Sequence, residues 1–269
     1  MIQTIPSYYN RFPVYYNIGG DEPPEPDWST MPLTFKALSN TNTNYVKLSG
    51  SAANWQYKIN DGAWQTYTNN SQVTLTSGDT VSFSGTNTGT NKATVVGEIG
   101  VYGNLSTAMG TTDMYANQFS GMFSSQTGLV HASGLIIPYT SASTKGLRQM
   151  FEKCTNLISP PQVYASGWAG NGGAAMFSGC TALTATPAMN FSVQYSGGNY
   201  TLQKMFINCS GMREAKIIGQ TTVNYHSDNY GNWLAQFSGC SVQKVEVDWT
   251  SWPSFAQTDV FLAGITSNN

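Results

Sequence analysis

A short phrase, Met-Phe-x-x-Cys followed three residues later by Leu or Met, recurs along the second half of the chain. Copies occupy residues 150–157, 176–183 and 205–212, with an earlier copy lacking the cysteine at 122–129 and degraded ones beginning at Gln236 and Val260. The equivalent Phe residues lie 28, 26, 29, 31 and 24 residues apart. A repeat of this length is typical of a solenoid, in which each unit buries its apolar side against its neighbours. The repeat therefore predicts a solenoid over residues 105–269.

Each copy also carries a pattern that is typical of a helix. Apolar residues recur at i, i+3, i+4 and i+7, as in Leu147, Met150, Phe151 and Cys154. The spacing predicts one short helix with a buried face in each unit, followed by a brief strand such as residues 244–249. The expected class is therefore α+β and β-rich. The buried ladder of the solenoid is expected to consist of Phe123, Phe151, Cys154, Phe177, Cys180, Phe206, Cys209, Phe237 and Cys240.

All four cysteines occupy the same place in the repeat. Cysteine is often a small buried residue, and equivalent positions stack along a solenoid, so a ladder of free buried thiols is the favoured interpretation. The even number leaves disulfides as the alternative. A metal site comes last, because the chain has no Cys-x-x-Cys pair and only His131 and His226 as further ligands.

Residues 31–104 change to a period of two. Apolar residues alternate with polar ones around Trp55, Tyr57 and Ile59, and Asn60-Asp61-Gly62 is a hairpin signal because Asp and Gly tolerate positive φ. Several short strands at this spacing predict a small antiparallel β-sandwich.

Residues 1–30 are expected to form an extended anchoring arm with a proline-rich spacer. Tyrosine pairs recur seven residues apart around Phe12, and an acidic Pro-rich stretch follows. We expect the arm to dock on another protein chain; folding back onto its own domain is the alternative. The predicted anchor residues are Pro6, Tyr8, Tyr9, Phe12, Pro13, Tyr15 and Tyr16.

The composition of the chain limits the classes of partner that it could bind. Only 10% of the residues are charged and the net charge is −2, which gives no electrostatic attraction to nucleic acid or to an anionic membrane. No apolar run is long enough to span a bilayer. The first residues lack the basic and apolar parts of a secretory signal peptide, so we expect assembly in the cytoplasm and release by lysis.

Residue patterns that could support catalysis are weak. Glu246 and Asp248 are two apart on an expected strand and could form a hydrolytic carboxylate pair, but a solvated strand face explains them better. The glycine-rich residues 167–173 lack the Lys-Ser/Thr of a phosphate loop. His131 and His226 have no nucleophile motif nearby. We expect no catalytic residue, no metal and no cofactor.

Aromatic residues lie in or beside the insertions between repeats, which in solenoids map to one face. They could contact a sugar or a protein surface, or could cover the edge of the solenoid. The candidate ligand-facing residues are Tyr164, Trp168, Tyr195, Tyr200, Tyr225 and Tyr230.

The unit Met-Phe-Ser-Gly-Cys-Thr-Ala-Leu at residues 176–183 resembles the BspA-like leucine-rich repeats of gut bacterial surface proteins and of Bacteroides phages. Residues 55–64 resemble the β-sandwich module that often precedes those repeats. Insertions at 164–173 and 190–199 lengthen the repeats, and the asparagine ladders of other leucine-rich repeats are absent.

The resemblance implies two settings. One is a bacteriophage virion protein, a head (capsid) fibre or decoration protein or a tail fibre, which binds other virion proteins through its arm and a host surface protein or glycan through its repeats. The other is a secreted adhesin on the bacterial cell surface. The missing signal peptide, the aromatic arm and the low charge favour the virion surface, and symmetric attachment there predicts a homo-oligomer.

Overall fold

The computed structural model describes residues 27–39, 43–110, 114–138, 141–142, 145–161, 163, 167–168, 170–187, 194–195, 203–217 and 237–247. Over these residues the chain is β-rich and has no α-helix. The strands are β1 (Leu33–Ala37), β2 (Asn44–Gly50), β3 (Ala53–Ile59), β4 (Gln65–Thr66), β5 (Val73–Leu75), β6 (Thr80–Asn87), β7 (Asn91–Val96), β8 (Ile99–Asn104), β9 (Leu129–His131), β10 (Leu135–Ile136), β11 (Ser141–Ala142), β12 (Gly167–Trp168), β13 (Gln194–Tyr195), β14 (Glu214–Ile217) and β15 (Lys244–Val247). A short 3₁₀ helix, η2 (Leu105–Ala108), follows β8.

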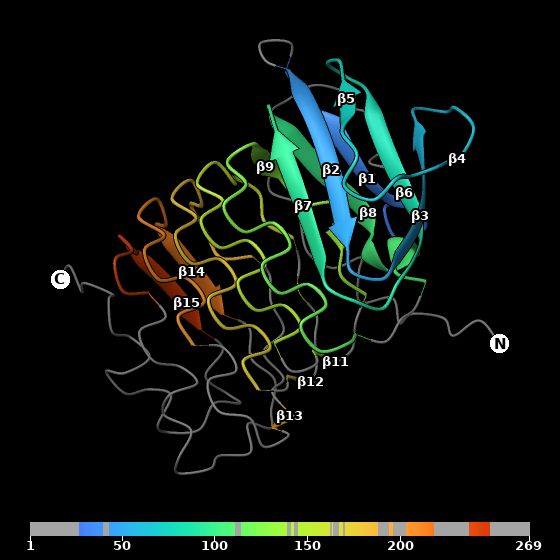
Figure 1. Cartoon of the computed structure of the whole chain (residues 1–269). Helices are drawn as coiled ribbons and strands as arrows, with labels where there is room; N and C mark the ends of the chain where they lie inside the picture. Colours follow the sequence, from blue (N-terminus) through green and yellow to red (C-terminus); the bar gives the residue numbers. More distant parts are fainter. Residues whose placement is uncertain are drawn as a thin grey trace.

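The first half of the described chain forms two layers of sheet. A seven-stranded sheet has the order β10-β8-β1-β6-β3-β4, with β9 also paired to β8, and a three-stranded antiparallel sheet has the order β5-β2-β7. Figure 1 shows the smaller sheet lying across the larger one. Phe35, Phe83 and Val46 are fully buried in the shared core. The Tyr67 hydroxyl accepts a hydrogen bond from the Leu48 amide at 2.9 Å, which ties the second layer to the first.

Period-two alternation and turn chemistry predicted most of this region. Along β2 the odd positions such as Tyr45 and Lys47 are half-buried, whereas Val46 and Leu48 are buried, as expected for a strand with one face on the core. Asn60 has a φ of 50° at the turn between β3 and β4, which pair antiparallel. The hairpin predicted at this position is therefore present.

The larger sheet is mixed, not antiparallel throughout. β9 and β10, from the repeat region, run parallel to β8, with Leu135 opposite Gly103. Strand β8 was not predicted, because Gly100 and Gly103 interrupt its apolar pattern and are typical of turns. The sheet thus joins residues before 104 to the first repeat.

The predicted short helices are wrong for the described repeats, which are built from successive four-residue turns. In the first repeat φ is positive at Asn117, Gly121 and Ser125, every fourth residue. Local hydrogen bonds close each turn, from the Ser120 amide to the Asn117 carbonyl at 3.1 Å and from the Ser124 amide to the Gly121 carbonyl at 3.1 Å. A period of four differs little from the helical 3.6 over two turns, so the apolar spacing suggested a helix.

Every second amide in this segment bonds to the next repeat instead of to its own turn. Phe123 donates to the Met150 carbonyl at 2.8 Å, and Phe151 donates to the Met176 carbonyl at 2.9 Å. The Phe177 amide continues the series to Met205 at 2.9 Å. An α-helix would use these amides internally and would leave no donor for a neighbour. Consecutive repeats therefore lie side by side, as the parallel traces in Figure 1 show.

Candidate functional site

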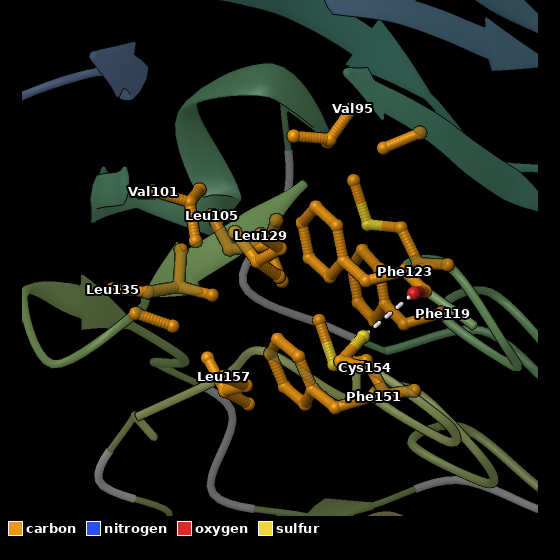
Figure 2. Packing of buried hydrophobic residues seen from close by; sticks show 14 of the residues in the cluster. Val95, Val101, Leu105, Phe119, Phe123, Leu129, Leu135, Phe151, Cys154 and Leu157 are labelled. Atoms are coloured by element: carbon orange, nitrogen blue, oxygen red, sulfur yellow. Dashed lines mark hydrogen bonds between the residues drawn. The ribbon is translucent and has the colours of Figure 1, made fainter. Parts of the chain in front are cut away.

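The repeats are held together by a column of phenylalanine rings, here called the Phe ladder. Its members are Phe123, Phe151, Phe177, Phe206 and Phe237, all of them buried. Successive ring centroids are 5.2, 5.4, 5.7 and 5.7 Å apart, with interplanar angles between 2° and 13°. Figure 2 shows Phe123 and Phe151 at the start of this column, with Leu129 and Leu157 packed beside them. Phe35 of β1 reaches Phe123 at 6.2 Å, so the core is continuous from the sheets into the repeats.

A column of thiols runs beside the Phe ladder. Each cysteine donates a hydrogen bond from Sγ to the carbonyl of the ladder residue in the preceding repeat. The pairs are Cys154 to Phe123 at 2.9 Å (Figure 2) and Cys180 to Phe151, Cys209 to Phe177 and Cys240 to Phe206 at 3.0 Å each. All four cysteines are free, and Cys240 alone among them is partly exposed. Burial raises the pKa of the Cys154 thiol to about 12, so Cys154 is structural and not nucleophilic.

The first repeat has no preceding repeat to bond to, and strand β7, at the edge of the three-stranded sheet, takes that place. Strand β7 donates to carbonyls of the first repeat, from the Ala93 amide to Met122 at 2.8 Å. Gln126 stands where later repeats have cysteine, and its Oε1 accepts a hydrogen bond from the Val95 amide at 2.8 Å. The repeat pattern marked Gln126 as an exception, but the partner on β7 is far away in sequence and was missed.

Replacing Gln126 by Leu tests this junction. The Val95 residue is only 3% exposed, so its amide would lose its acceptor in a place that water does not readily reach. We expect the free energy of unfolding to fall by about 1–3 kcal/mol in urea denaturation. Gln243→Leu, at an exposed position, is the matched control and should change little. Equal effects of the two variants would contradict the role given to Gln126.

One exposed or partly exposed hydroxyl per repeat forms a second regular feature, here called the hydroxyl row. Its members lie four residues after the ladder phenylalanines and are Thr127, Thr155, Thr181, Ser210 and Ser241. The Thr181 hydroxyl donates to the Thr155 carbonyl at 3.2 Å, which holds it along the direction of stacking. In the sequence the row is the residue after each cysteine and after Gln126, and only the stacking brings these hydroxyls into one line.

The predicted aromatic and anchor residues are only partly described. Trp168 in β12 and Tyr195 in β13 are partners in a parallel three-stranded sheet, so two of the candidate ligand-facing residues are neighbours in backbone register. Tyr164, Tyr200, Tyr225 and Tyr230 lie outside the described residues, as do the anchor residues Pro6, Tyr8, Tyr9, Phe12, Pro13, Tyr15 and Tyr16.

The residues considered for catalysis do not converge where the structure describes them. Glu246 of β15 is the backbone register partner of Lys216 in β14, and Lys244 is the partner of Glu214. Asp248 and His226 fall outside the described residues. Within the described ranges, no three His, Cys, Asp or Glu residues gather closely enough to hold a metal ion.

His131 is partly buried and contacts the next repeat. Its Nδ1 lies 3.1 Å from the Ser159 hydroxyl, on the next repeat, and burial lowers the pKa of the imidazole. A lowered pKa means that the folded state favours the neutral ring. The contribution to stability is therefore present above the unfolded pKa of about 6.5 and is lost as the pH falls below it.

Comparing His131→Asn with the parent protein tests this. Urea midpoints measured from about pH 8 to about pH 5 should fall more steeply for the parent protein, because the variant has no imidazole to protonate here. Asn can keep a hydrogen bond to Ser159. Parallel pH profiles would show that His131 titrates alike in the folded and unfolded states.

The fold and its surfaces define a β-rich protein in which a pair of sheets is continued by stacked repeats. Comparison of the chain with protein-family models, with curated proteins and with solved structures found no match. Over the part of the chain that the structure describes, no helix has the length and apolar character needed to cross a bilayer.

Proposed function

We propose that this chain is a structural protein of a bacteriophage virion, a capsid (head) fibre or decoration protein without catalytic activity. Residues 1–30 attach it to other virion proteins, and the repeats are displayed to a host cell-surface protein or glycan. The resemblance of the repeat phrase to BspA-like repeats supports the setting, and the low charge of the chain fits a surface that binds through hydroxyls and aromatic rings.

The observation that carries the proposal is a set of contacts that fixes the chain where it passes from residues 1–26 into the sheets. Trp28 stacks on Tyr102 of β8 with centroids 4.6 Å apart. The Asn104 side chain donates to the Ser29 carbonyl at 3.1 Å, and the Asn104 amide donates to Met31 at 2.8 Å. An arm that begins at a fixed point can transmit the position of an attachment site to the whole chain.

Attachment would then lie at one end of the stack and display along its length. Residues 1–30 meet the sheets at β8, beside the first repeat. The Phe ladder runs from Phe123 to Phe237 away from this point. We propose that the repeats form a single solenoid over residues 105–269, one repeat per turn. The hydroxyl row and the register neighbours Trp168 and Tyr195 would then face the host surface, since hydroxyls and aromatic rings are the groups that sugars and protein surfaces engage.

Deleting residues 1–26 tests the attachment. The truncated chain keeps Trp28 and the hydrogen bonds of Asn104, so it should fold and unfold with an unchanged midpoint. We expect it to be missing from purified phage particles analysed by mass spectrometry, whereas the full-length chain is present. A second variant with Tyr8, Tyr9, Tyr15 and Tyr16 replaced by Ser keeps the arm length and should also be lost if the aromatic rings anchor it.

Two outcomes would contradict the proposal. Recovery of the truncated chain on particles at the full-length level would show that the arm is not the anchor. Recovery of the full-length chain in the bacterial envelope, with none on particles, would favour the adhesin.

A further inference from the structure

The last described pair of thiols differs from the others in the thiol column. Cys209 and Cys240 occupy equivalent places in neighbouring repeats, where they donate to the Phe177 and Phe206 carbonyls, and the Asn208 amide beside Cys209 donates to the Ser238 carbonyl near Cys240 at 2.7 Å. Cys154 and Cys180 are fully buried, but Cys240 is partly exposed. A solvent-borne reagent can therefore reach one member of this neighbouring pair.

We propose that Cys209 and Cys240 form a reversible intramolecular disulfide when the protein meets a low-molecular-weight disulfide such as oxidised glutathione. This inference is independent of the proposed virion function and requires only the stacked repeats.

The backbone spacing suits such a bond. The ladder residues three positions before the two cysteines, Phe206 and Phe237, have ring centroids 5.7 Å apart, so the two repeats run as direct neighbours. The Asn208 amide donates to the Ser238 carbonyl at 2.7 Å, so the two backbones are hydrogen-bonded next to the cysteines. Backbones bonded to each other in this way lie about 4.8 Å apart, and a disulfide needs Cα atoms about 4.4–6.8 Å apart. Closing the bond therefore needs rotation of two side chains, which give up their hydrogen bonds to Phe carbonyls, and no rearrangement of the repeats.

The chemistry has two balanced steps. The Cys240 thiolate attacks one sulfur of oxidised glutathione, which forms a mixed disulfide at Cys240 and releases one glutathione thiolate. The Cys209 thiol then loses its proton to solvent and attacks the Cys240 sulfur, which forms the Cys209–Cys240 bond and releases the second glutathione. The protein is oxidised by two electrons and loses two hydrogen atoms, and glutathione disulfide is reduced.

The electrostatics assign the same order. Contact with Cys209 lowers the pKa of the Cys240 thiol, and that contact together with burial raises the pKa of Cys209. The exposed partner is thus the better thiolate and the buried partner the resolving thiol. The resulting link closes a loop from residue 209 to residue 240 in the unfolded chain, so oxidation should also raise the unfolding midpoint.

The test uses the full-length protein in its folded state. It is incubated with oxidised glutathione, blocked with N-ethylmaleimide, and analysed by intact mass and peptide mapping. We expect a loss of about 2 Da, one linked peptide pair containing Cys209 and Cys240, a higher unfolding midpoint, and reversal of all three by dithiothreitol.

Variants separate the two steps. Cys209→Ser should stop at a stable mixed disulfide on Cys240, Cys240→Ser should not react, and Cys154→Ser should oxidise like the parent protein. If a variant does not fold, the peptide map of the parent protein still decides. Absence of reaction, a mixed disulfide on Cys240 that persists in the parent protein, or a bond involving Cys154 or Cys180 would each overturn the proposal.

Discussion

Replacing Phe177 by Ala is expected to lower the free energy of unfolding by about 3–5 kcal/mol, because a buried ring leaves a cavity that the stack cannot close. Phe177 lies between two neighbours, with centroids 5.4 Å from Phe151 and 5.7 Å from Phe206, and is fully buried. Its amide donates to the Met205 carbonyl and its carbonyl accepts from the Cys209 thiol, both in the next repeat, so the backbone cannot easily move inward to fill the space. Urea denaturation followed by intrinsic fluorescence measures the change.

The control for this variant is Ile158→Ala in the same part of the chain. Ile158 is 41% exposed, so its truncation should cost within about 0.5 kcal/mol. If Phe177→Ala cost no more than the control, the ring would not be part of a continuous core.

Replacing Gly103 by Ala should be nearly as damaging, by about 4 kcal/mol, through two additive causes. Gly103 has a φ of +82°, which an Ala side chain rarely adopts. An added Cβ would also collide with the backbone carbonyl oxygen of Pro32. That backbone is held in place by Asn104 through Met31, so the collision cannot be relieved cheaply. The unfolding midpoint in urea measures the sum.

Gly78→Ala isolates the first cause. Gly78 has a φ of +84°, but nothing lies within 4 Å of an added Cβ. This variant should therefore show only the conformational cost, about 1–3 kcal/mol. Equal losses in the two variants would mean that the Pro32 backbone yields, and that the segment entering the sheets is not fixed there.

Local patterns predicted the parts of this fold that depend on one segment at a time. Alternation around Val46 and Leu48 identified a strand because one face of it is buried. The recurrence of Phe and Cys identified the residues that stack, because stacking requires equivalent residues at equivalent places. In both cases the chain carries the burial pattern in its own order.

The same patterns failed where geometry depended on a distant partner. The helix prediction was wrong because four-residue turns and helices share almost the same apolar spacing, and only the bonds from Phe123 to Met150 and from Phe151 to Met176 distinguish them. Strand β8 lies between β1 and β10, and Gln126 accepts a hydrogen bond from Val95. Both contacts bring together residues that are distant in the chain, and a single sequence does not show which distant residues meet. The hydroxyl row likewise becomes a surface only after the repeats are stacked.

Neighbouring repeats of this protein stack ring on ring along the Phe ladder. Selective labelling of phenylalanine and nuclear Overhauser measurements between rings test it most directly, because such contacts are detected only at short range. We predict a chain of cross-peaks that links Phe123 to Phe151, Phe151 to Phe177, and Phe177 to Phe206, whose centroids are 5.2, 5.4 and 5.7 Å apart. Cross-peaks confined to residues within one repeat, with none between ladder rings, would show that the rings do not stack.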